Sequence, residues 1–111
     1  MTKFLLFFLS LTLFTLTTSS AAIYKGQRVF VKRCLKCHGS GQVFVASYTM
    51  KEWKKLMVED GKPLADLHLS SKKASKSHSY FKSKKYTKKE KHLEQFLVEY
   101  AKDSGNIPAC N

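Results

Sequence analysis

Apolar residues recur with a helical period in the C-terminal part of the chain. Within residues 88–103 they occupy positions i, i+3, i+4 and i+7, at Leu93, Phe96, Leu97 and Tyr100. Thr87 and Glu90 stand three residues apart, as in a capping box, and Gly105 and Pro108 follow as helix stop signals. The pattern predicts one amphipathic helix from Lys88 to about Asp103.

A second stretch with this period covers residues 24–33. Val29 and Phe30 would face inward there, with basic residues on the opposite side. Gly26 lies inside the stretch, although alanine favours a helix over glycine by about 1 kcal/mol. A glycine at such a position predicts that another backbone passes very close.

The middle of the chain predicts a helix followed by a shorter helical piece. Thr49 and Glu52 have the spacing of a capping box and precede three apolar residues on one face, Trp53, Leu56 and Met57. Gly61 and Pro63 should end this helix. Residues 64–69 then form the second piece.

Two stretches lack a helical period. Residues 43–48 predict an apolar loop or a short extended piece. Residues 70–91 hold nine lysines and a single acidic residue, which is typical of a solvated loop, although four aromatic rings interrupt them: His78, Tyr80, Phe81 and Tyr86. No part of the chain suggests alternating strands and helices, so we expect an all-α fold.

The N-terminus resembles a secretion signal. Lys3 precedes an uncharged apolar run over residues 4–16, and small residues follow at Ser20-Ala21-Ala22. We expect a signal peptide over residues 1–22 and one soluble, exported domain over residues 23–111, in the periplasm if the chain is bacterial. An uncleaved anchor is the alternative, but the run is shorter than the roughly twenty residues that span a bilayer.

The most informative motif is Cys34-Leu35-Lys36-Cys37-His38. Two thiols three positions apart, with an imidazole next to the second, have the spacing of covalent haem attachment. Cys34 and Cys37 would bind the haem, and His38 would be the proximal iron ligand. An export signal agrees with this interpretation, because c-type haem is attached outside the cytoplasm.

Other interpretations of the motif are weaker. A thioredoxin-like pair would accompany a βαβ pattern. Gly39 and Gly41 extend the motif to the repeat found in the zinc centre of J-domain chaperones, but only one repeat is present. A zinc site needs four ligands, and Cys110 alone cannot complete a second pair.

The terminal helices and the motif between them resemble class I c-type cytochromes. In that family the two helices cross through a glycine and an aromatic residue upstream of the haem motif, positions that Gly26 and Phe30 match. Leu97 and Tyr100 match their partners on the last helix. The resemblance implies a small helical fold around one haem c, whose haem-free form we expect to be largely unfolded, and an electron carrier rather than an enzyme.

One departure concerns the second axial ligand, which is commonly a methionine well beyond the proximal histidine. Met50 and Met57 follow His38 too closely to reach the opposite face, so we expect them in the core. Three histidines remain. His92 is expected at the surface or in a cap, His78 is the first candidate because its separation from His38 matches the family, and His68 is the alternative.

The formal net charge of +12 sets the class of partner. An exported protein meets no nucleic acid, so an acidic redox protein, such as a dehydrogenase or a member of a terminal oxidase chain, is expected to bind exposed lysines, and peripheral association with an anionic membrane is the alternative. Lys36, Lys82, Lys84 and Lys85 would then steer that partner. A haem-based sensor with an open sixth iron position is the alternative function, and a zinc-binding interaction module is a third.

Overall fold

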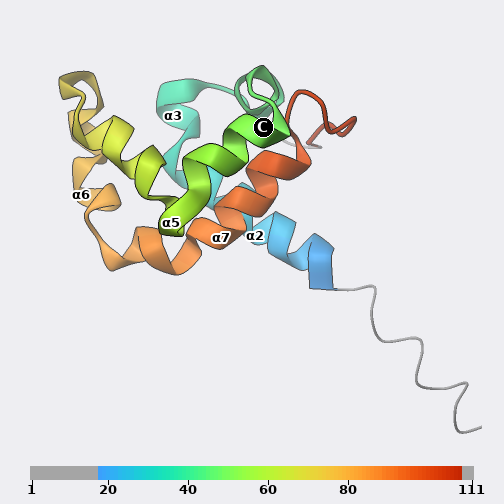
Figure 1. Ribbon diagram of the computed structural model, residues 1–111, viewed down its shortest axis with the longest axis horizontal. Helices are drawn as coiled ribbons and strands as arrows, with labels where there is room; N and C mark the ends of the chain where they lie inside the picture. Colours follow the sequence, from blue (N-terminus) through green and yellow to red (C-terminus); the bar gives the residue numbers. More distant parts are fainter. Residues whose placement is uncertain (1–17, 109–111) are drawn as a thin grey trace, which may run out of the picture.

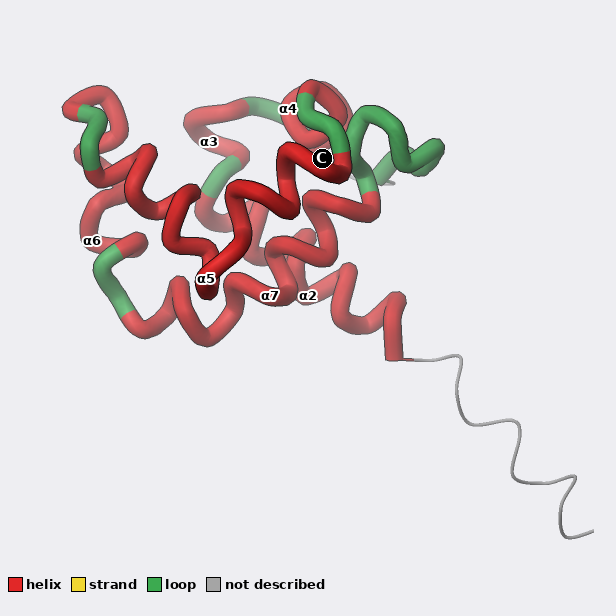
Figure 2. Tube along the Cα trace, viewed as in Figure 1, coloured by secondary structure: helices red, strands yellow, loops and turns green. Residues whose placement is uncertain are grey.

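Helices form the described part of the chain, residues 18–108 of a computed structural model, and no strand occurs within that range (Figure 2). The predicted all-α fold is therefore confirmed for these residues. The longer elements are α2 (Thr18–Arg33), α5 (Met50–Leu69) and α7 (Lys84–Glu99). Short helical turns connect them: α3 (Leu35–His38), α4 (Gly41–Phe44), η1 (Val45–Ser47), η2 (Lys72–Ser77) and α6 (His78–Phe81).

Helices α2 and α7 lie side by side, as Figure 1 shows. A Cβ added to Gly26 would overlap the backbone carbonyl of His92 and would lie 2.7 Å from Cβ of Phe96. The close approach predicted from Gly26 is thus confirmed. The aromatic contact across the crossing joins Phe30 to Phe96, with ring centres 5.5 Å apart.

Phe96 is the α7 residue that faces Gly26 and Phe30. Of the two expected partners, Leu97 is buried in the core, and Tyr100 packs against the ring of Phe96 at 5.2 Å. The sequence pattern therefore identified the helix that α2 contacts but did not single out Phe96.

Helix α5 begins at the predicted capping box. The Thr49 hydroxyl accepts a hydrogen bond from the Glu52 amide at 3.2 Å, and the Glu52 carboxylate accepts one from the Thr49 amide at 2.9 Å. The helix is interrupted at residues 58–61, where Glu59 and Asp60 have positive φ angles of 51° and 56°. The predicted break before a second helical piece is confirmed.

The hydroxyl of Tyr86 on α7 secures this kink. It donates a hydrogen bond of 2.5 Å to the carbonyl of Gly61, and both residues are buried. Because Gly61 has a φ of 75° and a Cβ there would meet the Tyr86 ring, the position requires glycine for two reasons.

The prediction for residues 43–48 was wrong. Residues 43–48 form α4 and η1 rather than an extended loop: Phe44 donates its amide hydrogen to the Ser40 carbonyl at 2.9 Å, and the turn buries Val45 completely while leaving Val43 exposed. In extended backbone, residues two positions apart would lie on the same face. The helical turns place Val43 and Val45 on different faces instead.

The last helix begins four residues earlier than predicted and ends at Glu99. Ser83 is its N-cap, and the Thr87 hydroxyl donates to the Lys84 carbonyl at 3.1 Å, as an interior helical residue does. Glu90 is buried at 2% exposure, so its carboxylate does not cap Thr87. Starting the helix at Lys84 allows Tyr86 to reach the core.

The core consists mainly of side chains from α2, α5 and α7, with Trp53, Phe30 and Phe96 among the largest fully buried ones. Met57 is buried and Met50 packs against this cluster, which agrees with the core roles expected of them. No helix between residues 18 and 108 is long and apolar enough to cross a membrane. Of the predicted signal peptide, residues 1–17 lie outside the described part.

Candidate functional site

The cysteine-histidine motif follows α2 directly and folds into α3. The Cys34 amide donates to the Phe30 carbonyl at 2.8 Å, which continues the helical bonding of α2, and the His38 amide donates to the Cys34 carbonyl at 2.9 Å. Gly39, with a φ of 80°, ends the turn. This local fold brings both thiols and the imidazole to one wall of a cavity.

The cavity has a volume of about 420 Å³, which lies within the range of cofactor and small-molecule sites, about 300–1,000 Å³. Its walls come from the end of α2, from α3 and α4, from both parts of α5, and from η2, α6 and α7. The lining is largely apolar and includes no carboxylate. Its polar groups, apart from the motif, are mostly hydroxyls and cations: Arg33, Tyr48, Ser71, Lys73, Lys76 and Ser77.

His68 faces His38 across this cavity. Their ring centres are 5.9 Å apart and their planes are nearly perpendicular, at 82°. Each ring also has an aromatic partner: Phe44 stacks on His38 at 4.2 Å, and Phe81 stacks on His68 at 4.3 Å. Aromatic rings from two further elements, α4 and α6, therefore hold the two imidazoles in place.

The hydrogen bond of His68 selects its tautomer. Nδ1 lies 2.8 Å from the carbonyl oxygen of Leu64, one helical turn earlier. Because a carbonyl only accepts, Nδ1 carries the hydrogen, and Nε2 keeps its lone pair. A histidine that ligates a metal through one nitrogen commonly donates the other N–H to a carbonyl in this way.

His78 has the opposite arrangement. Its Nε2 lies 2.8 Å from the carbonyl of His68 and 3.0 Å from that of Ser71. Both partners are acceptors, so Nε2 carries the hydrogen and has no lone pair for a metal. His78 starts α6 and does not line the cavity.

The protonation behaviour of the motif follows from its surroundings. Desolvation raises the pKa of Cys34 to about 12, with a further contribution from the charge of Cys37. Desolvation, and secondly the charge of His68, lowers the pKa of His38. His38 is therefore neutral at pH 7 and offers a lone pair, whereas the thiol of Cys34 stays protonated.

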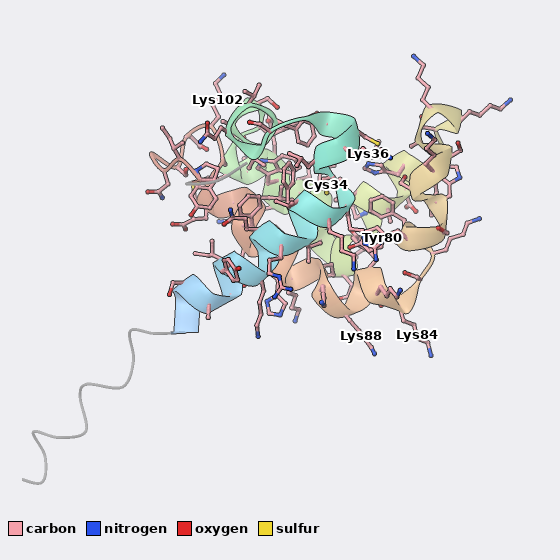
Figure 3. All side chains as sticks on the ribbon, turned by 180° about the vertical axis from the view of Figure 1, so that it is seen from behind. Cys34, Lys36, Tyr80, Lys84, Lys88 and Lys102 are labelled. Carbon is pink, nitrogen blue, oxygen red and sulfur yellow. The ribbon has the colours of Figure 1, made fainter. Side chains whose placement is uncertain are left out.

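The remaining candidates lie elsewhere. His92 is on α7, where its backbone faces Gly26 and its Nδ1 is buried without a hydrogen-bond partner. Cys110 is outside the described residues. Lys36, Lys82, Lys84 and Lys85 are all exposed, and Figure 3 shows Lys84 pointing away from the body of the molecule, as does Lys88.

The sequence pattern did not predict that η2 contributes to the cavity wall. Ser71, Lys73 and Ala74 line the cavity, although the lysine-rich composition suggests only solvated loop. Their position directly after His68 in the chain is the signal that could have placed them there.

Comparisons with protein-family models, with curated proteins and with solved structures give no match to this chain. Within residues 18–108, no group of three or more histidine, cysteine, aspartate and glutamate side chains is arranged to hold a metal ion.

Proposed function

We propose that this protein is an exported monohaem c-type cytochrome that carries electrons. One observation supports the proposal above the others: Cys34, Cys37 and His38 share a wall of an apolar cavity whose opposite wall presents His68. Thioether attachment requires two thiols at the edge of such a cavity, and a porphyrin requires apolar walls on both faces. The residues present fit both requirements.

The separation of the two imidazoles also fits an iron ion between them. A metal bound by two facing imidazoles, with metal–nitrogen distances of about 2 Å, separates the ring centres by roughly 6 Å. The rings of His38 and His68 are 5.9 Å apart. A porphyrin supplies the other ligands, so no further protein side chain is required. His68 therefore becomes our preferred sixth ligand in place of His78.

A haem held by Cys34, Cys37, His38 and His68 would supply one-electron redox chemistry, and a second histidine would give it a lower potential than a methionine. The chain contributes the attachment points, a neutral His38, and a His68 whose tautomer is fixed. Aromatic rings also pack on both imidazoles, Phe44 on His38 and Phe81 on His68. If His38 and His68 both held the iron, the site would have no place for a substrate, which favours electron transfer over ligand sensing.

A visible absorption spectrum of the purified holoprotein tests the proposal. We expect a Soret band that remains with the polypeptide after denaturation and acidic solvent extraction, because the haem is covalently bound. The reduced native protein should bind carbon monoxide poorly, whereas His68→Leu should bind it readily through an opened sixth position. A chain that carries no haem when it is exported by a host competent for haem attachment would refute the proposed function.

The partner is proposed to be an acidic redox protein. Lys73 and Lys76 line the cavity and are exposed, as is Lys36 between the two motif cysteines. The double substitution Lys36→Glu/Lys76→Glu should slow electron exchange with an acidic partner about tenfold and flatten its dependence on ionic strength. Lys25→Glu is the control, because this exposed residue lies nine positions before Cys34 on α2. Equal slowing by the control would indicate net charge rather than a docking face.

A further inference from the structure

The imidazole of His78 binds back to the start of the segment that joins it to His68. Helix α5 ends at Leu69, and η2 and the start of α6 lead the chain back to His78. The Nε2–H of His78 donates to the carbonyls of His68 and Ser71, at 2.8 and 3.0 Å. One side chain therefore binds the end of α5 and the entry to η2 together.

His68 needs such support because of its place in the helix. It is the penultimate residue of α5, and the last four carbonyls of a helix have no partner in regular helical bonding. Terminal turns of this kind fray. The His68 carbonyl accepts from the Ser71 amide at 3.1 Å as well as from His78, so two hydrogen bonds to one oxygen hold the residue whose ring faces His38.

The surrounding sequence supplies little alternative support. Residues 70–76 are mostly polar, and lysines and serines among them are exposed. The other side-chain hydrogen bonds at the last turn of α5 are the one from His68 Nδ1 to the Leu64 carbonyl, at 2.8 Å within the helix, and the one from the Ser70 hydroxyl to the Leu67 carbonyl, at 3.2 Å on the surface. Water competes with an exposed bond of this kind, whereas the His78 ring is half-buried.

We propose that His78 is a positioning residue that holds the end of α5 so that His68 stays directed at the position opposite His38. This inference rests on the proposed function. His78 would act through its hydrogen bonds to backbone carbonyls. It would not bind the iron directly, although its distance from His38 along the sequence suggests that role. His78 contacts the backbone of the ligand residue and leaves its ring free.

The test compares two substitutions in the holoprotein. In His78→Gln the side-chain amide can still donate to both carbonyls, whereas His78→Leu removes the donor at similar size. We expect both variants to keep the Soret band and low-spin spectrum. The rate of carbon monoxide binding to the reduced protein should rise about tenfold or more in His78→Leu and stay within about twofold of native in His78→Gln, because binding requires His68 to leave.

Thr49→Ala is the control for a purely structural effect. It destabilises the same helix at its other end by removing the capping box and should leave carbon monoxide binding unchanged. If Thr49→Ala and His78→Leu accelerate binding equally, or if neither does, the positioning role is refuted. Loss of the low-spin spectrum in both His78 variants would identify His78 as the ligand and also refute it. A native protein without a Soret band would instead refute the proposed function.

Discussion

The two halves of the interior are built differently. Where α2 crosses α7, backbone and side chains meet directly, with no space left even for a Cβ on Gly26. Where α3 faces the end of α5, the elements are separated by a cavity of about 420 Å³ with apolar walls. The helix crossing is fully packed by the polypeptide itself. In the other half, the side chains on either side of the cavity would be in contact only through a group that fills it, and the proposed haem is that group.

Removal of the two thiols should have the largest effect on stability, because it empties the cavity half. In Cys34→Ser/Cys37→Ser the cavity walls lose the group that would fill the space, and a core of this size is marginal without a cofactor. We expect the exported variant to lack covalent haem and to show no cooperative thermal transition by far-ultraviolet circular dichroism. A haem-free variant that unfolds cooperatively would show that the crossing can hold the fold by itself.

Gly26→Ala tests how tightly α2 and α7 pack at their crossing. Helix propensity alone would favour alanine by about 1 kcal/mol. The added Cβ, however, would overlap the backbone carbonyl of His92, which cannot move like a flexible side chain, so we expect a net destabilisation of about 2 kcal/mol. Denaturant unfolding of the holoprotein measures it, with Val31→Ala, exposed on the same helix, as the control.

A stabilising effect of Gly26→Ala would mean that the two helices can separate at little cost. Its haem spectrum should remain native in either case, because Gly26 lies at the crossing and does not line the cavity. A changed axial coordination in this variant would show that the packing of α2 on α7 affects the cavity, so that the two halves of the interior are not independent.

Tyr86 connects the two halves, because its hydroxyl on α7 holds the kink of α5 at Gly61. Tyr86→Phe leaves the ring contacts and removes this buried hydrogen bond, so the Gly61 carbonyl loses a partner. We expect the free energy of unfolding to fall by about 1–2 kcal/mol. Denaturant unfolding of the holoprotein measures the change, and Thr87→Val, which removes an exposed hydroxyl bond from the same helix, should cost less.

How far the sequence predicts this molecule depends on whether a signal is local. Thr49 and Glu52 form their capping box because both partners lie within four residues and face solvent. Thr87 and Glu90 have the same spacing, yet burial of Tyr86 and Glu90 places Thr87 inside the helix. Long-range packing decided that case, and no neighbouring residue reveals it.

The candidate site shows the same distinction. Residues 34–38 predict their own chemistry because the motif is contiguous. The histidine that faces His38 depends on where the kink at residues 58–61 directs the second part of α5. Separation along the chain favoured His78, but the turns η2 and α6 direct its ring back toward the His68 carbonyl. Only the three-dimensional path of the chain distinguishes the two histidines.

Substitution of Glu90 should change the free energy of unfolding least. It tests whether a buried charge destabilises the half of the interior in which α2 packs on α7. Its side chain is 2% exposed, and Oε2 has no hydrogen-bond partner. Burial raises the pKa of Glu90, the charges of Glu94 and Asp60 raise it further, and Lys91 opposes them. The folded state thus binds a proton more tightly than the unfolded state, so ionisation destabilises the fold as pH rises through the range between the two pKa values.

Glu90→Gln removes that charge at nearly constant shape. We expect the variant to be more stable than the native holoprotein by about 1 kcal/mol at pH 7, because burying an ionised carboxylate costs more than burying an uncharged amide. The advantage should shrink toward zero below about pH 4, where an ordinary glutamate is protonated in both states. Paired denaturant curves at pH 7 and pH 4 measure it. An advantage that persists unchanged at pH 4 would mean that the amide gains a new contact, and that the carboxylate of Glu90 carries no electrostatic penalty in the packed half.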